Sequence, residues 1–265
     1  MFGQLHILGS GSAHTTPCHG CSCETCKEAI KNPKYRRDCS TYLFKFENFN
    51  ILIDYGSHLL NKFNLNLLKI NYIFISHTHP DHIKGLYSLC WTKQAQIPVY
   101  YSNSEISNAF QFLLDKPKNL IFKEYKKFES IKLNDNLEII PIPLNHNINT
   151  HGFLINYKNY LIAYLLDTKG LPKKTMDFLT ELNDLDLVLV DANYGPDLMH
   201  KSHNNINEAL DLINQLSPKK SIITHISHLN LPVKELIKYI QKNTPKPLNR
   251  QIFLAYDGLI INFQK

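Results

Sequence analysis

The sequence has no apolar run that approaches the roughly 20 residues of a transmembrane helix. We therefore expect no membrane span and no membrane partner. Its first residues, MFGQLHILG, lack the basic stretch and the long apolar stretch of a secretory signal peptide. Together these absences predict a cytoplasmic protein, a compartment in which thiols stay reduced.

Internal repeats, low-complexity linkers and a strong charge bias are also missing. A length of 265 residues suits one large domain, and we predict a single domain over residues 1–265. The 29 Lys and Arg residues exceed the 23 Asp and Glu residues and leave a formal net charge of +6. This excess helps to attract a small phosphorylated substrate but is too diffuse to predict a nucleic-acid partner. The sequence leaves the oligomeric state open, and a homodimer is compatible with it.

Cysteine is scarce outside one short stretch, since four of the six cysteines lie within residues 18–26. Clustered thiols in a chain without a secretory signal are more typical of metal sites than of disulfides. The motif CSCETC provides three thiols: Cys21, Cys23 and Cys26. A fourth ligand would complete a tetrahedral structural zinc site. His228 is the best candidate, with Cys18 and His19 as competitors, and free thiols in a loop are the alternative.

The most informative motif is HTHPDH at residues 77–82, which is separated from the apolar run YIFI at residues 72–75 only by Ser76. The run is typical of a buried strand, so four side chains that bind metals emerge together from one strand end. His77 and His79 point the same way and can hold one ion, while Asp81 and His82 can reach a second. Imidazole with carboxylate suits zinc, manganese, iron or nickel better than calcium or magnesium. Inert histidines in a polar loop are the alternative.

Three further polar residues come just after apolar, strand-like runs: His146, Asp167 and His225. If these strands share one orientation, the side chains lie at the same rim of a sheet sandwich. Asp54 ends a similar run, ILID, upstream of the histidine motif. Each position alone is weak evidence for a metal ligand.

Strand and helix patterns follow one another along the chain. Strands are predicted at residues 5–8, 41–46, 50–54, 72–75 and 98–101, at several places between residues 120 and 166 that include 151–157 and 160–166, and at 185–190 and 220–224, with two more at the end. Helices are predicted at residues 24–31, 83–89, 105–114, 173–182, 205–216 and 233–242. Strand-rich halves that each end in helices predict an α/β (α+β) fold, a four-layer αββα sandwich.

The histidine motif and the later strand-end residues resemble the signature of the metallo-β-lactamase superfamily. The cysteine cluster, NPKYRR at residues 32–37, LDTKGLP at 166–172 and THISH at 224–228 are also similar to the PhnP family of phosphoribosyl cyclic phosphodiesterases. This resemblance covers nearly the whole chain. It implies the metallo-β-lactamase αββα sandwich, with residues 14–40 as a cysteine-rich zinc-binding insertion. The quinone-synthesis protein PqqB carries a similar cysteine motif, so that motif alone does not decide between the two.

The resemblance implies a metal centre with two divalent ions, manganese or zinc, and one separate structural zinc. The ligands implied for the first ion are His77, His79 and His146. Those implied for the second are Asp81, His82 and His225, with Asp167 as the bridge. The structural zinc is implied at Cys21, Cys23, Cys26 and His228. Asp81 and His203 are the implied catalytic residues, because His203 matches a histidine that lies over the substrate without binding metal, and His200 is its rival.

These features predict a metal-dependent phosphodiesterase for a small cyclic phosphate ester such as 5-phosphoribosyl 1,2-cyclic phosphate. Two ions that share a water can generate the nucleophile, and His203 can protonate the leaving alkoxide. The alternatives are other phosphodiesters, such as 2′,3′-cyclic nucleotides, and a non-enzymatic accessory protein like PqqB. Asp54 and Asp257 are candidate acceptors for the imidazole N–H groups of ligands. Arg36 and Arg37 either bind a substrate phosphate or face solvent.

Overall fold

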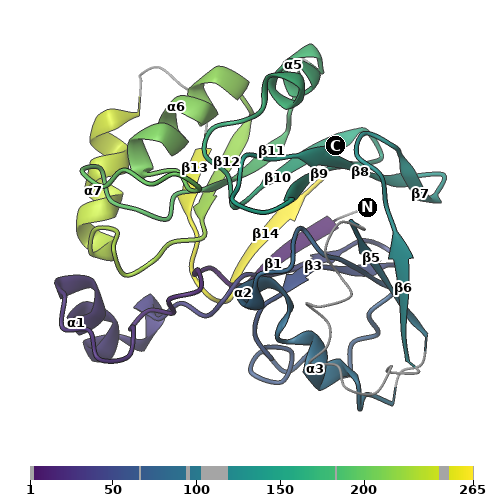
Figure 1. Ribbon diagram of the computed structural model, residues 1–265, viewed down its shortest axis with the longest axis horizontal. Coiled ribbons are helices and arrows are strands. Elements are labelled where there is room, and N and C mark those ends of the chain that lie inside the picture. The colour runs from purple at the N-terminus through teal and green to yellow at the C-terminus, as the bar shows by residue number, and fades with distance from the viewer. Residues whose placement is uncertain are drawn as a thin grey trace.

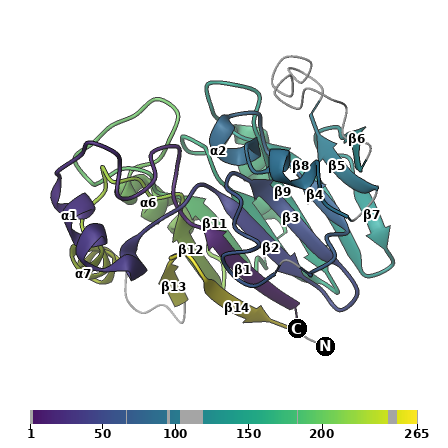
Figure 2. The ribbon, with the colours of Figure 1, turned by 90° about the horizontal axis from the view of Figure 1, so that it is seen from below.

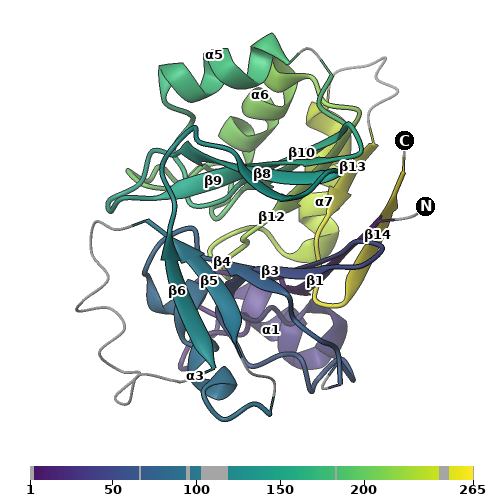
Figure 3. The same ribbon diagram turned by 90° about the vertical axis from the view of Figure 1, so that its right-hand side faces the viewer.

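The computed structural model of the protein describes residues 3–65, 67–93, 96–102, 119–182, 184–244 and 251–264. Two seven-stranded sheets lie face to face (Figure 1). Helices cover the outer face of each sheet, and the four layers are seen most clearly in Figure 3. The αββα sandwich predicted from the sequence is confirmed. Among the described residues, no helix has the length and apolarity that a membrane span requires.

The first sheet has the strand order β14-β1-β2-β3-β4-β5-β6. Its strands are β1 (Gly3–Gly9), β2 (Thr41–Lys45), β3 (Asn50–Tyr55), β4 (Tyr72–Phe74), β5 (Ile97–Tyr101), β6 (Leu120–Glu124) and β14 (Leu259–Phe263). Pairing is antiparallel from β14 to β3 and parallel from β3 to β6. Gly3 on β1 lies opposite Phe263 on β14, so the first and last strands of the chain end side by side (Figure 2).

The second sheet has the strand order β13-β12-β11-β10-β9-β8-β7. Its strands are β7 (Ile131–Asn134), β8 (Leu137–Pro143), β9 (His151–Tyr157), β10 (Tyr160–Leu165), β11 (Leu187–Asp191), β12 (Lys220–Thr224) and β13 (Gln251–Leu254). Pairing is antiparallel from β7 to β10 and parallel from β10 to β13. Both sheets therefore change from antiparallel to parallel pairing part of the way across.

The helices of the described residues are α1 (Glu24–Lys31), the 3₁₀ turn η1 (Pro33–Tyr35), α2 (Pro80–Ile83), α3 (Leu86–Leu89), α5 (Lys173–Glu181), α6 (Ile206–Leu216) and α7 (Val233–Asn243). A capping box starts α6, because the Asn205 side chain accepts from the Glu208 N–H and the Glu208 carboxylate accepts from the Asn205 N–H. Buried residues such as Ile206, Leu210 and Ile213 recur at helical spacing. That spacing turns one face of α6 toward the second sheet.

Apolar residues alternate between two interfaces along the inner strands. On β9, Phe153 and Ile155 belong to the cluster between the two sheets, whereas Leu154 belongs to the cluster between the second sheet and its helices. A third cluster lies under α2 and α3 on the first sheet and includes Leu52 and Ile73. Because these strands are covered on both faces, they are apolar almost throughout. A rigid pair of sheets therefore supports the loops at their ends.

One predicted helix differs from the structure. The helix expected at residues 83–89 is split into α2 and α3 at Gly85, and α2 starts earlier, at Pro80. Proline suits the first turn of a helix, and a Cβ on Gly85 would lie 2.4 Å from the Tyr55 carbonyl oxygen. This close approach to β3 ends the first helix. The helix predicted at residues 105–114 lies outside the described residues.

Candidate metal centre

Side chains with metal-binding atoms gather at one rim of the sandwich, where several strands end. His77 follows β4, His146 follows β8, Asp167 follows β10 and His225 follows β12, while Asp191 is the last residue of β11. The strands β8, β10, β11 and β12 run in the same direction, because β8 and β10 both pair antiparallel with β9. Carboxyl ends of strands with one direction meet at one edge of a sheet, so residues distant in sequence come together.

Three histidines form a first group of possible ligands. The Nε2 atom of His77 lies 2.9 Å from Nδ1 of His79, and Nε2 of His146 lies 3.2 Å from the same atom. Neighbouring nitrogens on one ion, each about 2.1 Å from it, are separated by roughly 3.0–3.4 Å in octahedral or tetrahedral geometry. The three ring nitrogens are therefore spaced as ligands of one ion.

A second group contains two carboxylates and two histidines. Asp167 lies 2.7 Å from Nε2 of His82 and 3.3 Å from Nε2 of His225. Asp81 lies 3.5 Å and 3.6 Å from the same two nitrogens. Asp167 also forms a possible ligand group with His77 and His82. Its carboxylate therefore lies between the two groups of histidines, as a bridging ligand would.

Unsatisfied polar atoms in the cluster show that these residues fit metal ions. His82 Nε2, His225 Nε2 and Asp167 Oδ2 are fully buried, and none has a hydrogen-bond partner in the described structure. His82 and Asp167 approach closely, but without the alignment of a hydrogen bond. Buried polar atoms without partners are costly and rare. Cations placed among these atoms would satisfy all three.

Asp54 supports the cluster from behind. It accepts hydrogen bonds from the Ser76 amide and hydroxyl at 2.8 Å each, and from the Tyr164 hydroxyl at 2.7 Å. It also lies 2.7 Å from Nδ1 of His82. The Nδ1–H of His82 is thus held by Asp54, and its Nε2 is turned toward the centre. This contact agrees with the role expected for Asp54.

Asp257, by contrast, has no hydrogen bond or ion pair with a histidine in the described part of the chain. It accepts hydrogen bonds from the amide and hydroxyl of Ser10 and from the amide of Asp38. The prediction that it holds an imidazole N–H is therefore wrong. Asp257 and Asp54 both lie near the end of a strand, so their positions look alike in the sequence. In the structure, Asp257 follows β13 and lies beside Ser10 and Asp38, away from the metal centre.

The pKa values of the cluster follow from burial and from the carboxylates. Burial lowers the pKa of His77 well below its usual range and that of His146 to about 4. Burial also opposes the charged form of His82 and His225, but Asp167 and the other carboxylates outweigh it. They raise the pKa of His82 well above its usual value and that of His225 to about 10. Metal ions would replace these protons as the positive charges of the site.

His203 forms a further possible ligand group with Asp167, Asp191 and His225, and Asp191 is a carboxylate that was not predicted from the sequence. Nδ1 of His203 is 2.8 Å from Asp191 and 3.3 Å from Asp167. Burial opposes the charged form, but Asp191 raises the pKa of His203 above its usual value. The signal for Asp191 was available, because the run LVLVD ends in a carboxylate as the strand before Asp167 does. The rival, His200, is exposed, and its Nδ1 accepts from the Ser202 amide.

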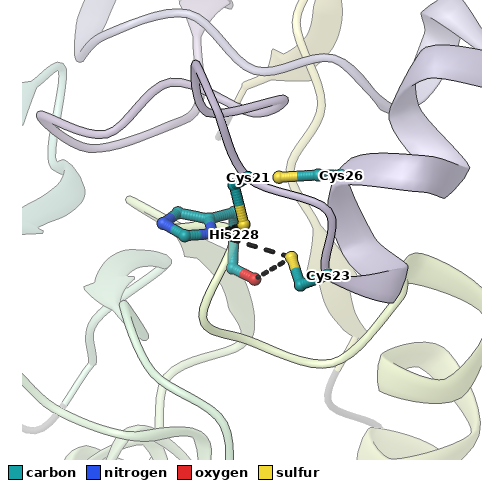
Figure 4. A group of neighbouring side chains, drawn as sticks. All are labelled: Cys21, Cys23, Cys26 and His228. Atoms are coloured by element: carbon teal, nitrogen blue, oxygen red, sulfur yellow. Dashed lines mark hydrogen bonds between the residues drawn. The ribbon is translucent and has the colours of Figure 1, made fainter.

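The cysteine cluster forms a separate site between the insertion and the segment that contains His228 (Figure 4). Its four candidate ligand atoms lie within 4.8 Å of one another and come from Cys21, Cys23, Cys26 and His228. Nδ1 of His228 is 3.3 Å from Sγ of Cys21 and 3.6 Å from Sγ of Cys23. A tetrahedral zinc with bonds of about 2.3 Å to sulfur and 2.0 Å to nitrogen separates such atoms by about 3.5 Å. The geometry therefore fits one zinc ion.

Cys18 and His19 are the two residues that compete with His228 as the fourth zinc ligand. Cys18 forms a possible group with His14 and His228, while its amide donates to Sγ of Cys26 at 3.3 Å. His19 is exposed to solvent. The group with three thiols is the better zinc site, because structural zinc sites commonly use three or four cysteines.

Neither of the two adjacent arginines touches the metal centre. The Arg36 Nε donates to the Ala29 carbonyl at 3.3 Å. The Arg37 Nη1 donates to Ser10 Oγ at 2.8 Å and to the Ala255 carbonyl at 2.6 Å. Within the described residues neither guanidinium contacts a residue of the histidine cluster. The structure therefore does not support a role for them in holding a phosphate at that cluster.

Comparisons with known proteins give consistent results. A family model described as a beta-lactamase superfamily domain matches residues 50–226. A solved structure described as a new diphosphatase from the PhnP family aligns with a TM-score of 0.82 and 26% identity, covering 99% of this chain and 98% of that chain. The similarity to that structure extends over the insertion as well as the sandwich.

Two curated relatives cover most of the chain. An octanoyltransferase of Porphyromonas gingivalis (strain ATCC BAA-308 / W83) is 24% identical over 266 residues, which is 96% of this chain and 50% of that protein. A ribonuclease Z of Methanococcus maripaludis (strain C7 / ATCC BAA-1331) is 27% identical over 258 residues, covering 90% of this chain and 71% of that protein. The chain thus spans half the length of the octanoyltransferase.

Proposed function

Because the chain belongs to the beta-lactamase superfamily, we propose that it is a dinuclear-metal hydrolase that cleaves a small cyclic phosphate ester. The first substrate to test is 5-phosphoribosyl 1,2-cyclic phosphate. The observation that carries the proposal is the position of Asp167 between two groups of ligand atoms. A diphosphatase and a ribonuclease among its relatives support bond cleavage at phosphorus.

The residues of the centre would divide between two ions. His77, His79 and His146 would hold one, Asp81, His82 and His225 would hold the other, and Asp167 would be the ligand that they share. Two bound divalent ions supply a nucleophile from water near neutral pH and neutralise charge on the phosphoryl oxygens. The protein's part is to hold the ligands rigidly at the strand ends, so that little reorganisation accompanies the reaction.

His203 would act as the general acid. Its Nδ1 is held by Asp191 at 2.8 Å, which leaves Nε2 as the nitrogen that can give a proton to substrate. Asp191 favours the protonated ring, so the proton is available when the ester bond breaks. The side chain is 13% exposed, which allows contact with a bound substrate. Delivery of this proton to the leaving alkoxide prevents the build-up of an unstable anion.

A diphosphatase is the second candidate function. A PhnP-family diphosphatase shares 26% identity over 99% of this chain. Its substrate class presents a phosphate as the leaving group, which needs a proton less than a ribose alkoxide does. Dependence of the rate on His203 therefore distinguishes the two candidates.

The test is a hydrolysis assay with the full chain loaded with Mn²⁺ or Zn²⁺. The substrates are 5-phosphoribosyl 1,2-cyclic phosphate, a 2′,3′-cyclic nucleotide, a sugar diphosphate and a precursor tRNA with a 3′ trailer. We expect the highest kcat/KM with the cyclic ribose phosphate. A higher value with the sugar diphosphate would favour the second candidate, and a higher value with the tRNA would contradict both. Full metal loading without hydrolysis of any substrate would favour a non-enzymatic accessory protein.

A further inference from the structure

A cavity lies away from the metal centre, between the cysteine-rich insertion, α7 and β13. Its volume is about 420 Å³, which is in the range of small-molecule sites. The insertion and α7 are joined here, because the Glu28 carboxylate accepts from the amide of Val233 at 2.7 Å. Both elements are seen together with β13 in Figure 2. No residue of the metal centre or of the cysteine cluster lines this cavity.

Arg37 brings a buried positive charge to the cavity. It is 4% exposed and lines the cavity wall. Its Nη1 is used by Ser10 and the Ala255 carbonyl, whereas Nε and Nη2 have no hydrogen-bond partner among the described residues. No carboxylate of the described part lies within ion-pair distance of this guanidinium. Burial lowers the pKa of Arg37 to about 10, so it still carries its charge at neutral pH.

The neighbouring carboxylates are engaged elsewhere. Asp257 accepts from Ser10 and Asp38, and Glu28 accepts from the amide at the start of α7. Residues 245–250, PKPLNR, follow α7 in sequence and contain no Asp or Glu. Asp257 and Glu28 favour the charged form of Arg37 through space, but neither forms an ion pair with its free Nε and Nη2 atoms, so part of the cost of burying this charge remains. An anion in the cavity would offset that cost.

The other lining residues indicate which chemical groups the ligand carries besides its negative charge. Six of the twelve lining residues are apolar residues of α7 and β13, among them Ile237, Ile240 and Leu254. Lys34 Nζ lies 5.2 Å from the centre of the Tyr256 ring, and both residues line the cavity. The wall therefore suits an aliphatic or aromatic group. Because Nε and Nη2 of Arg37 lie on one edge of the guanidinium, they match the two oxygens of a carboxylate.

We propose that this cavity binds one small organic carboxylate with an apolar body, independently of the metal centre. The carboxylate accepts two hydrogen bonds from the free edge of Arg37, and Lys34 adds a second positive charge. The apolar body packs against α7 and β13. This site is separate from the proposed hydrolase function, so either can fail without the other.

The binding test uses calorimetric titration of the metal-loaded full chain. The probes are hexanoate, phenylacetate, their neutral amides and phenyl phosphate. We expect at least one carboxylate to bind with one site per chain, and its amide to bind at least about tenfold more weakly because the charge-assisted hydrogen bonds are lost. Equal binding of acid and amide, no binding of either carboxylate at millimolar concentration, or preference for phenyl phosphate would each overturn the proposal.

Variants locate the site without removing the buried arginine. Ile237→Trp adds bulk to the cavity wall from α7 and should weaken carboxylate binding at least about tenfold. The matched control is Ile260→Trp, since Ile260 is also partly exposed but lies on β14 and does not line the cavity. We expect Ile260→Trp to bind like the wild type. Binding that is unchanged in Ile237→Trp, with an unchanged melting temperature, would place the ligand elsewhere and overturn the proposal.

Discussion

His225 and His228 lie three residues apart but belong to two different candidate metal sites. The histidine cluster collects its atoms from four separate parts of the chain, each positioned by a strand end. The cysteine cluster takes three of its four atoms from the segment CSCETC, which contains no strand. The first site is therefore built by the sheets, whereas the second lies at the start of α1 and is held by a few contacts, such as the hydrogen bond from Thr25 to Asn230, and by the metal that it would bind.

The segment between the two histidines connects the sites. The Ile226 amide donates to the Ser10 carbonyl and the Ser227 amide donates to the Asn193 carbonyl. The Thr25 hydroxyl, on α1, donates to the Asn230 carbonyl at 2.8 Å. A change in the cysteine cluster can therefore disturb the histidine cluster through the backbone, while the rigid strands limit the opposite effect. Four substitutions test this asymmetry.

Asp167→Ala should have the largest effect on activity. It removes the carboxylate shared by the two ligand groups, and we expect kcat/KM to fall by at least about 10³-fold with loss of catalytic metal. Zinc at the cysteine cluster should stay bound. The measurements are hydrolysis rates and metal content per chain. The control is Asp177→Ala, which removes an exposed carboxylate on α5 and should behave as the wild type. If Asp167→Ala keeps activity within tenfold of the wild type, the bridging ligand lies elsewhere.

His203→Ala should keep both catalytic metals and lower kcat by about 10²–10⁴-fold on a ribose alkoxide leaving group. The loss should be smaller on a nitrophenolate ester, which needs no proton. Because Asp191 raises the pKa of His203, the wild-type kcat should stay high as pH rises past about 6.5 and fall only as the raised pKa is passed. That alkaline fall should vanish in the variant.

His200→Ala is the matched control for the general acid and should change kcat little, because His200 is exposed and makes no ion pair with a carboxylate among the described residues. Equal losses on both substrates in His203→Ala would remove the general-acid role. A lost metal would make His203 a ligand instead.

Cys23→Ser should lose one zinc per chain and lower the melting temperature by roughly 5 °C or more, because structural zinc contributes folding free energy. Activity should fall less than in Asp167→Ala, since the histidine ligands remain on their strands. Metal analysis and thermal unfolding check both. The control is Cys90→Ser, at the end of α3, in which the zinc content of the chain should be unchanged. An unchanged zinc content in Cys23→Ser would refute the cysteine site.

Tyr164→Phe should have the smallest effect on activity. It removes a buried hydroxyl that donates to Asp54 at 2.7 Å, so the free energy of unfolding should fall by about 1.5–3 kcal/mol. Metal affinity should fall by at most about tenfold, because Asp54 still holds His82. Denaturant unfolding and chelator competition provide the values. The control is Tyr239→Phe, which loses an exposed hydrogen bond to Asn207 and should change the free energy of unfolding by less than about 0.5 kcal/mol. Equal effects of the two variants would show that the hydrogen bond from Tyr164 to Asp54 does not stabilise the protein.

The local sequence predicted most of the strands and helices, because apolar runs and capping residues act over a few positions. It also indicated the residues of both clusters, since a histidine, carboxylate or thiol just after a strand or within a short motif is visible without a fold. It did not predict where the first helix after the histidine motif would break. That break depends on the close approach of Gly85 to β3, a contact between distant parts of the chain.

The sequence by itself determined which side chains could bind metal and that they follow strands. Only the tertiary structure decided which of those side chains meet. It brought Asp54 to His82 and Asp191 to His203, it led Asp257 to Ser10, and it enclosed Arg37 beside an apolar cavity. These outcomes depend on the pairing order and direction of the strands across two sheets. The side-chain pattern along one strand does not predict the order of the strands, because that order depends on packing between segments that are far apart in the chain.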